Sequence, residues 1–461
     1  MTTIEHFEYV FLGGGKGGKT LAMELAQAGR KVAVIERHMI GGSCINVACI
    51  PTKTLIHTAR TEYLLHRQDG TASDMAKVSQ RVKAVVDDMV EINRNAFRDA
   101  GLELVLGTGR FVAPRRLEVQ TNDGGLRVIE GEHAFINTGT TAAIPDVPGL
   151  KAAEPLTHVE ALVLTTLPES LIVLGGGYIG LEMAQAFHRL GSKVTLIQDA
   201  PRVAMREDED VTEAIEAALK DEGIDIRTGV KPVSVTGKSG KSVTVLLQNG
   251  SSVSGSHILV AAGRTPVTSG IGLDAAGVEV DERGFIKTDE RLATTAERTW
   301  AIGEVAGTPM FTHASFDDYR VLRSQLAGVN AKTTSYRIIP YALFIEPELG
   351  RIGLSEADAK AHGIAVRVAK LPMAAVPRAR TSGATKGFMK MLIDAQSDAI
   401  LGFAMLGANA GDVVTAVQMA MLGGLPYTAV RDAIIAHPLM SEGLNILLAK
   451  VPKRALNKQP G

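Results

Sequence analysis

Cysteine is nearly absent from this chain, whose 461 residues include only Cys44 and Cys49. Two cysteines cannot build the multi-disulfide framework of a small secreted domain, and they supply only half of the four ligands of a structural zinc site. A disulfide between residues this close would constrain almost no chain, so it would add little stability. The pair is therefore either two buried reduced thiols or a redox-active couple, and spacing alone leaves both interpretations open.

The chain also lacks an excess of charge of either sign and a long apolar run. It has 49 Lys and Arg against 50 Asp and Glu, a formal net charge of −1. Balanced charge gives no electrostatic reason to expect nucleic acid or an anionic membrane surface as a partner. The N-terminal MTTIEHFE does not resemble a signal peptide, and Asp412 interrupts the most weakly charged stretch, 399–430. We expect a soluble cytoplasmic protein without a membrane span, and in the cytoplasm a disulfide is more often catalytic than structural.

Glycine, in contrast, is abundant, and it marks a dinucleotide-binding pattern near the N-terminus. Residues 9–13 form a short apolar strand that runs into a glycine-rich turn, an amphipathic helix and the strand KVAVIE. Gly13, Gly15 and Gly18 fit the pattern GxGxxG, which places a phosphate group at a helix N-terminus. Glu36 ends the second strand, where an acid can bind ribose hydroxyls.

The same turn also matches the P-loop pattern GxxxxGK[ST], with Gly13 at its start and Lys19-Thr20 at its end. A P-loop NTPase is therefore an alternative from another class of protein. Both patterns hold phosphate at a helix N-terminus, but Glu36 and the helix of βαβ length favour a dinucleotide.

Residues 171–199 repeat this arrangement, with Gly175, Gly177 and Gly180 forming a second GxGxxG between a strand and an amphipathic helix. One such pattern is weak evidence. Two of them, each in the order strand, turn, helix and strand, predict two dinucleotide sites.

Gln198 stands in the second copy where the first copy has an acid. An NAD site uses an acid at this position, and an NADP site has an arginine nearby. Loss of the acid removes repulsion of a 2′-phosphate, and Arg202 could reach that group, which favours NADPH over NADH. The alternative, that Arg202 and Arg206 are ordinary solvated charges, stays open.

Two further segments, GGSCINVACIPTK at 41–53 and HPLMSE at 437–442, complete a family resemblance. Together with the two glycine-rich patterns, they resemble the flavin-dependent pyridine nucleotide–disulfide oxidoreductases, such as glutathione reductase, dihydrolipoamide dehydrogenase and mercuric reductase. The family pattern is GGTCxNxGCxPSK, and Ser43, Ala48 and Thr52 replace its Thr, Gly and Ser. The resemblance implies an α/β protein with two Rossmann-like dinucleotide-binding domains, for FAD and NAD(P), and a C-terminal α+β dimerisation domain.

The resemblance and the proline-punctuated linker at 144–149 predict four segments. They are an FAD-binding domain at 1–148, an NAD(P)-binding domain at 149–268, a central segment at 269–335 that completes the FAD site, and a dimerisation domain at 336–461. Within them, residues 53–101 are predicted to be largely helical, and residues 102–139 alternate like antiparallel strands. In the last segment, FMKMLID and ILGFAMLG are predicted to be strands and VVTAVQMAMLGG an apolar helix.

The resemblance also implies roles for the catalytic residues. Cys49 is expected to face the flavin as a thiolate, and Cys44 to be the exposed interchange thiol of a redox-active disulfide. Lys53 and Glu182 are expected to pair beside the reactive nitrogen of the flavin.

At the C-terminus, His437 is expected to exchange a proton with the interchange thiol, with its ring oriented by Glu442. In the family this pair comes from the other subunit, so the resemblance implies a homodimer with shared active sites. Tyr178 is expected to cover the flavin until the nicotinamide arrives.

The remaining family motifs predict the rest of the cofactor contacts. Residues 137–139 (NTG) and 261–263 (AAG) resemble the two exit motifs of the nucleotide domains, and Glu304 replaces the usual Asp of a motif that binds the flavin side chain. The predicted FAD-binding residues are Gly13, Gly15, Gly18, Glu36, Arg37, Gly42, Ser43, Lys53, Thr138, Gly139, Gly303, Glu304, His313 and Ala314. The predicted NAD(P)-binding residues are Gly175, Gly177, Tyr178, Gly180, Gln198, Arg202 and Gly263.

The sequences DDYR at 317–320 and VPRAR at 376–380 resemble a mercuric-reductase-like branch that includes reactive-chlorine-resistance flavoproteins with copper(II) reductase activity. Mercuric reductases of the well-known type carry an extra C-terminal cysteine pair, which this chain lacks. We expect electrons to pass from NAD(P)H through FAD and the Cys44–Cys49 disulfide to copper(II), mercuric ion or a low-molecular-weight disulfide. No resident metal is predicted. Dihydrolipoamide dehydrogenase is the alternative within the family, and a non-catalytic flavoprotein is a further one.

Overall fold

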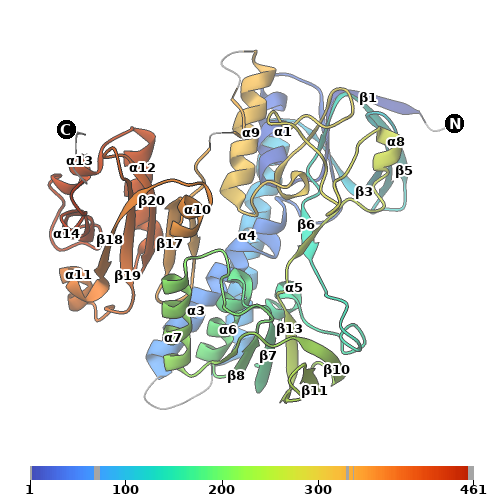
Figure 1. Cartoon of the computed structure of the whole chain (residues 1–461). Coiled ribbons are helices and arrows are strands. Elements are labelled where there is room, and N and C mark those ends of the chain that lie inside the picture. The colour runs from blue at the N-terminus through green and yellow to red at the C-terminus, as the bar shows by residue number, and fades with distance from the viewer. Residues whose placement is uncertain (1–2, 67–72, 329–331, 336, 455–461) are drawn as a thin grey trace.

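The computed structural model describes residues 3–66, 73–328, 332–335 and 337–454, which form three lobes around two long central helices (Figure 1). These helices are α3 (Cys49–His66) and α4 (Met75–Ala100). The sequence predicted a largely helical stretch from Lys53 to Gly101, and the structure divides it into these two helices. The Asp74 side chain caps α4 by accepting a hydrogen bond from the Ala76 N–H at 3.1 Å, and Gly101, at φ 73°, ends it.

The first lobe is a Rossmann-like unit. Its elements are β1 (Ile4–Leu12), α1 (Lys16–Gln27), β2 (Val32–Glu36), α2 (Ser43–Asn46), β3 (Glu103–Ala113), β4 (Arg116–Thr121), β5 (Leu126–Ile136), β15 (Thr299–Ala301) and α9 (Thr312–Leu326). β1 lies between β2 and β5 in parallel register, and β3, β4 and β5 continue as the predicted antiparallel strands. Helices α1 and α9 pack against one face of the parallel strands, and a second apolar cluster covers the other face, so the strands are continuously apolar.

The second lobe repeats this unit. Its parallel sheet has the order β13 (His257–Val260), β7 (Ser170–Leu174), β8 (Lys193–Ile197) and β9 (Asp225–Arg227), with α6 (Tyr178–Leu190) between β7 and β8 and α7 (Glu209–Glu222) after β8. An antiparallel sheet of β10 (Pro232–Lys238), β11 (Ser242–Leu247) and β12 (Ser252–Gly255) packs beside it. The chain passes between the lobes through the antiparallel pair β6 (Thr140–Ala142) and β14 (Arg264–Pro266), which directly follow the two predicted exit motifs.

The third lobe is an antiparallel sheet with helices, as the α+β prediction required. The strand order is β16 (Tyr341–Leu343), β17 (Leu349–Gly353), β20 (Ile400–Leu406), β19 (Phe388–Asp394) and β18 (Val366–Pro372). Its helices are α10 (Glu356–Ala361), α11 (Pro377–Thr381), α12 (Ala410–Leu422), α13 (Tyr427–Arg431) and α14 (Gly443–Leu448). The predicted strands FMKMLID and ILGFAMLG and the predicted apolar helix VVTAVQMAMLGG are all present.

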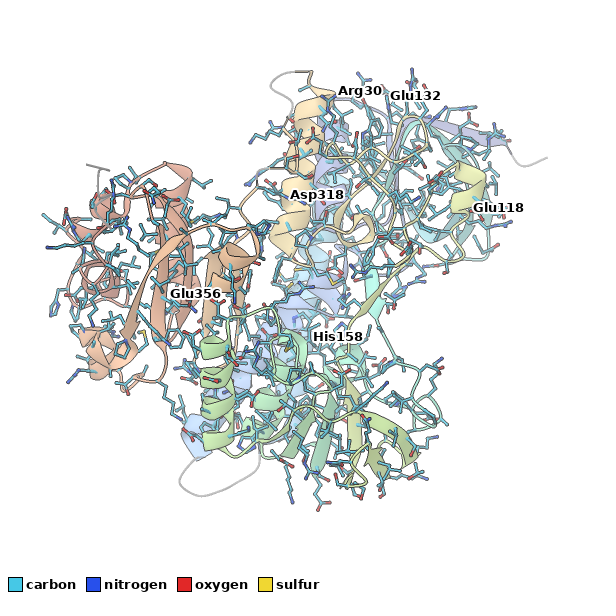
Figure 2. The ribbon with its side chains drawn as sticks, viewed as in Figure 1. Arg30, Glu118, Glu132, His158, Asp318 and Glu356 are labelled. Atoms are coloured by element: carbon cyan, nitrogen blue, oxygen red, sulfur yellow. The ribbon has the colours of Figure 1, made fainter. Side chains whose placement is uncertain are left out.

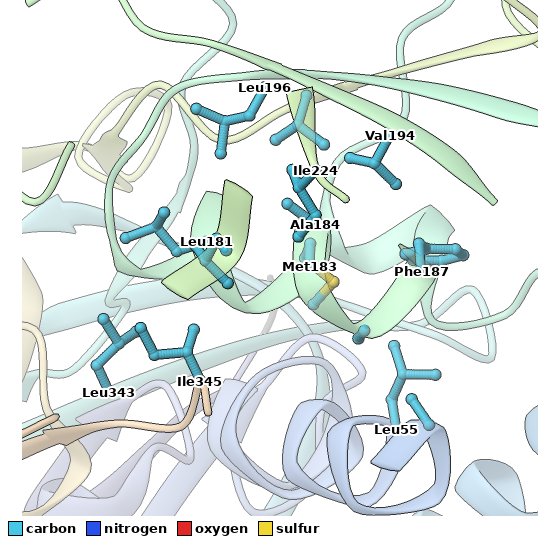
Figure 3. Close-up of a cluster of buried hydrophobic side chains, with 14 of the residues drawn as sticks. Leu55, Leu181, Met183, Ala184, Phe187, Val194, Leu196, Ile224, Leu343 and Ile345 are labelled. Carbon is cyan, nitrogen blue, oxygen red and sulfur yellow. The ribbon is translucent and has the colours of Figure 1, made fainter. Parts of the chain in front are cut away.

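One hydrophobic core joins the three lobes at the point where the site residues meet. Figure 3 shows Leu55 of α3 beside Phe187 of α6, with Leu343 of β16 in the same cluster. Because burial of these side chains holds α3 against α6, it also fixes the distance between polar residues on the two helices. No helix within the described ranges has both the length and the apolar character needed to cross a bilayer.

Candidate active site

A cleft of about 1310 Å³, measured out to its open mouth, lies in the first lobe beyond the carboxyl ends of β1 and β2. This is where open parallel sheets bind ligands. The predicted residues that line it are Gly13, Gly15, Glu36, Arg37, Gly42, Ser43, Thr138, Gly139, Gly303 and Glu304, together with Cys44. The predicted residues Gly18, Lys53, His313 and Ala314 do not line it, and Phe311, Thr312 and Ser315 supply the contacts from the start of α9.

The glycine turn is shaped so that a dinucleotide fits the cleft. Gly13 has φ +103°, and a Cβ atom there would lie 2.4 Å from the Asn137 carbonyl oxygen. A Cβ atom on Gly42, at φ +85°, would lie 2.7 Å from the Gly15 Cα. No side chain of the described residues caps α1, so its first N–H groups are open to a phosphate. Gly18 has a packing role instead, because a Cβ atom there would lie 2.6 Å from the Asn137 amide.

The acid at the end of β2 closes this turn. One Glu36 carboxylate oxygen accepts a hydrogen bond from the Gly14 N–H at 2.7 Å, and the other accepts from His38 and Met39 at 3.0 and 2.9 Å. The second nucleotide unit has the same contact with an amide, because the Gln198 side-chain oxygen accepts from the Gly176 N–H at 2.7 Å. This contact occupies the Gln198 side-chain oxygen and does not use its Nε2 group, which is a hydrogen-bond donor.

The second glycine turn is as tightly packed as the first. Gly175 has φ +111°, and Cβ atoms on Gly175 and Gly180 would lie 2.5 and 1.9 Å from backbone carbonyl oxygens. Among the residues that the structure describes, none lies within 4 Å of a Cβ atom placed on Gly177, so this side of the turn is open to a ligand. Arg202 forms an ion pair with Glu209 at 3.0 Å at the edge of this region. Gly263 has φ +133° and accepts a backbone hydrogen bond from Ala143 at 3.0 Å, which joins the two exit segments.

Tyr178 is anchored at the start of α6. Its hydroxyl donates to Glu207 Oε1 at 2.5 Å, and the Tyr341 hydroxyl donates to the same oxygen at 2.7 Å. Arg351 neutralises this buried carboxylate at 2.8 Å. Burial and the adjacent Glu207 charge raise the pKa of Tyr178, so the phenol stays protonated and holds its ring in place.

Cys44 lies in α2 and Cys49 begins α3, and the two thiols interact with each other. The Cys44 thiol donates a hydrogen bond to the Cys49 sulfur, which is the main cause that lowers the pKa of Cys49 to about 6. The Thr312 hydroxyl, 3.1 Å from the Cys49 sulfur, and the charge of Lys53 act in the same direction. The interaction with Cys49, together with burial, raises the pKa of Cys44. These interactions favour a thiolate on Cys49 over one on Cys44.

Lys53 and Glu182 form an ion pair across the α3–α6 contact. The Lys53 ammonium lies 2.7 and 3.0 Å from the two carboxylate oxygens of Glu182, which is buried. The Phe344 N–H donates to the same carboxylate at 3.0 Å. The pair joins all three lobes and stands one helical turn beyond Cys49.

His437 and Glu442 are also paired, because the His437 Nδ1 atom lies 3.0 Å from both carboxylate oxygens. Asn445 holds the preceding loop by donating to the carbonyls of Val430, Arg431 and Ala433. The pair lies between α13 and α14, at the outer edge of the third lobe and away from α3 (Figure 1), and the imidazole is 66% exposed. Within one chain, the structure does not bring His437 to the cysteines.

Glu304 and the DDYR segment form a supporting network for the cleft. The Arg264 Nε–H donates to Glu304 at 3.2 Å, and the Thr140 hydroxyl donates to the same carboxylate oxygen. Asp318, fully buried on α9 (Figure 2), accepts from the Gly303 N–H and the Thr308 hydroxyl, both at 2.8 Å. Burial raises the pKa of Asp318, although its ion pair with Arg337 opposes that shift.

Several residues at the site carry no sequence signal. Thr312 contacts Cys49, which is 263 residues away in the sequence, and Arg264 contacts Thr140, which is 124 residues away. These contacts arise because α9 and β14 return to the first lobe late in the chain. The cleft-lining residues that the sequence did not mark include Lys16, Thr140, His158, Arg264, Thr312 and Ser315.

Two dinucleotide-binding units beside a pair of close thiols define a flavin- and pyridine-nucleotide-dependent oxidoreductase that works through sulfur. Comparison with known proteins agrees. The family model described as pyridine nucleotide-disulphide oxidoreductase matches residues 7–318, and the model of its dimerisation domain matches residues 339–447. The chain belongs to this family.

Individual relatives span nearly the whole chain. The probable pyridine nucleotide-disulfide oxidoreductase RclA of Escherichia coli is 38% identical over 96% of this chain and 99% of its own length. A mercuric reductase of Bacillus cereus is 33% identical, over 97% of this chain and 72% of its own length. The solved structure of the Cu(II) complex of the HOCl-induced flavoprotein disulfide reductase RclA from Escherichia coli superimposes with a TM-score of 0.90. It is 36% identical and covers 96% of this chain and 99% of that chain.

Proposed function

We propose that the protein is an NADPH-dependent copper(II) reductase in which the Cys44–Cys49 pair delivers the electrons. The observation that carries the proposal is the thiol pair itself, with a thiolate favoured on Cys49 and Cys44 lining the cleft. Sulfur is a soft ligand suited to copper(I), the product of the reaction. The likeness to RclA, whose solved structure is a Cu(II) complex, supports a copper substrate over a disulfide.

The residues that would hold FAD are those of the first cleft. The glycine turn at 13–15 and the N-terminus of α1 would bind its pyrophosphate, Glu36 a ribose, and Glu304 with Thr140 its side chain. When bound, FAD supplies a two-electron relay between the pyridine nucleotide and the sulfur pair. Lys53 would place its ammonium near the cysteine end of α3, and Glu182 would hold it there while cancelling part of its charge.

Reduction and reoxidation of the Cys44–Cys49 disulfide conserve atoms and electrons. Two electrons break the Cys44–Cys49 bond, and with one proton they leave a thiolate on Cys49 and a thiol on Cys44. His437 of the second subunit would accept that proton, and two copper(II) ions would each take one electron. The disulfide then re-forms with release of two copper(I) ions and the proton.

A homodimer is part of this proposal, because His437 must reach the cysteines of the other chain. The third lobe matches the family's dimerisation domain and presents several exposed apolar side chains near His437. They are Met419, Leu422, Leu425, Ile434 and Leu439, and Ile434 is 104% exposed. An apolar surface of this kind is typical of an interface.

The preference for NADPH is proposed from Gln198. Its side-chain oxygen accepts from the Gly176 N–H, so its amide N–H groups would be left to donate to a 2′-phosphate. An acid at that position would repel the phosphate. Equal or higher kcat/KM with NADH would contradict this preference, and Gln198→Glu should move the preference toward NADH.

The test is anaerobic titration of the purified protein with NADPH, followed by a substrate panel. A long-wavelength thiolate–flavin absorbance band should appear, and NADPH consumption should be stimulated by copper(II) and abolished in Cys44→Ser. Rapid turnover of lipoamide without copper stimulation would favour a dihydrolipoamide dehydrogenase and overturn the copper proposal. Absence of the band would favour a non-catalytic flavoprotein.

A further inference from the structure

Lys19, the lysine of the P-loop-like pattern, is buried inside the first lobe. Its exposed fraction is 4%, although lysine is almost never fully buried without a partner. The side chain leaves α1 toward α4, where its ammonium donates to the Asn93 side-chain oxygen. Thr20, the second residue of that pattern, only donates to the Lys16 carbonyl of its own helix at 2.7 Å. Neither residue lines the cleft where the phosphates would bind.

Asn93 is held so that its oxygen must face the lysine. Its amide nitrogen donates to the Met89 carbonyl at 2.7 Å, which fixes the orientation of the amide. Asn93 also packs against the cysteine loop, because a Cβ atom on Gly41 would lie 3.1 Å from the Asn93 Cγ. Asn93 therefore connects Lys19 to the loop that carries Cys44.

The charge of Lys19 has no carboxylate to neutralise it among the residues that the structure describes. This distinguishes it from Lys53, which Glu182 pairs at 2.7 Å. Burial lowers the pKa of Lys19 to about 8, and Lys16 on the same helix adds to that effect. Cys44 is the group that opposes it, because a negative charge on its sulfur favours the ammonium.

We propose that Lys19 is a positioning residue for the redox pair, whose buried ammonium, held by Asn93 beside the loop that carries Cys44, stabilises negative charge on the Cys44 sulfur. Each cysteine then has its own lysine, Lys53 for Cys49 and Lys19 for Cys44. The inference rests on the proposed role of Cys44 as the thiol that exchanges with substrate. Charge develops on that sulfur whenever His437 removes its proton, and a nearby fixed cation makes this step easier.

The chain allows a direct test because it has only two cysteines. In a Cys49→Ser background, Cys44 is the sole thiol, and its reaction with iodoacetamide across pH 5 to 11 reports its thiolate fraction in the flavin-loaded protein. Lys19→Met should raise the midpoint by about one pKa unit and slow alkylation below the midpoint about tenfold. Lys77→Met, at an exposed lysine on α4, is the matched control and should leave the midpoint unchanged.

Two further variants distinguish loss of the Lys19 charge from a folding defect. Lys19→Arg keeps the charge and should hold the midpoint near that of the parent. Asn93→Asp places a carboxylate against the ammonium, so it should raise the midpoint in the same direction as Lys19→Met. Equal midpoints in the parent, Lys19→Met and Asn93→Asp would overturn the proposal, as would a flavin content that falls in Lys19→Met while the midpoint stays the same.

The outcome is independent of the substrate. A midpoint shift without copper(II) reduction would support the role of Lys19 and refute the copper assignment. Copper(II) reduction without a midpoint shift would support the copper assignment and refute the role of Lys19.

Discussion

The Lys53–Glu182 ion pair should control the charge on Cys49, and its two members should act in opposite directions. Lys53 follows Cys49 by one turn of α3, so their side chains are about 6 Å apart. At an effective dielectric constant of about 20, a unit charge at that distance is worth about 3 kcal/mol, or about two pKa units. Glu182, 2.7 Å from the ammonium, cancels part of this field, and Lys53 is 35% exposed, which weakens it further.

Lys53→Met should therefore raise the pKa of Cys49 by about one unit from its value of about 6. Glu182→Gln should lower it by about half a unit, because the lysine charge is then uncompensated. The double variant should lie between the two. Since a lowered thiol pKa supplies a thiolate only above that pKa, the acid limb of turnover should move toward neutral pH in Lys53→Met and away from it in Glu182→Gln.

The measurement is alkylation of Cys49 as a function of pH in a Cys44→Ser background, where it is the only thiol. Lys83→Met, at an exposed lysine that pairs with Asp87 on α4, controls for loss of a distant charge. If Glu182→Gln raises the midpoint as Lys53→Met does, the field argument is wrong. Glu182 would then act by holding Lys53 in position.

Three other outcomes follow from the structure. Lys390→Met should destabilise the junction of the second and third lobes by about 3–5 kcal/mol in urea unfolding, because its buried ammonium lies 2.8 Å from each of three carboxylates. Lys370→Met, which removes an exposed lysine bound to one of the same acids, should cost less than about 1 kcal/mol. Ile434→Glu should give monomers in size-exclusion chromatography, whereas Val163→Glu, at a 70% exposed position on the second lobe, should stay dimeric. His437→Gln should lower turnover about 10²–10⁴-fold, and undiminished turnover would contradict its role as the proton acceptor of the other subunit's site.

Local patterns predicted the parts of the site that depend on few neighbouring residues. Both glycine turns are where GxGxxG placed them, because Gly13 and Gly175 need a positive φ and close backbone contact. The sequence also predicts that Glu36 and Gln198 occupy equivalent positions, since each stands at the end of a strand at the same distance from its glycine turn. The division between α3 and α4 was missed, although Asp74 is a good N-cap residue, because the apolar spacing continues on both sides of it.

The fold class, the two dinucleotide units and the closeness of the only two cysteines could be predicted from the sequence, because these features depend on chain spacing and on backbone freedom at glycine. Three contacts could be seen only in the folded chain: Thr312 lies against Cys49, Asp318 holds the Gly303 turn, and the lysine of the P-loop-like pattern turns inward to Asn93. Those contacts join residues far apart in the chain or on the far side of a helix. They are set by how α1, α4 and α9 pack against the cysteine loop, and no local pattern encodes that packing.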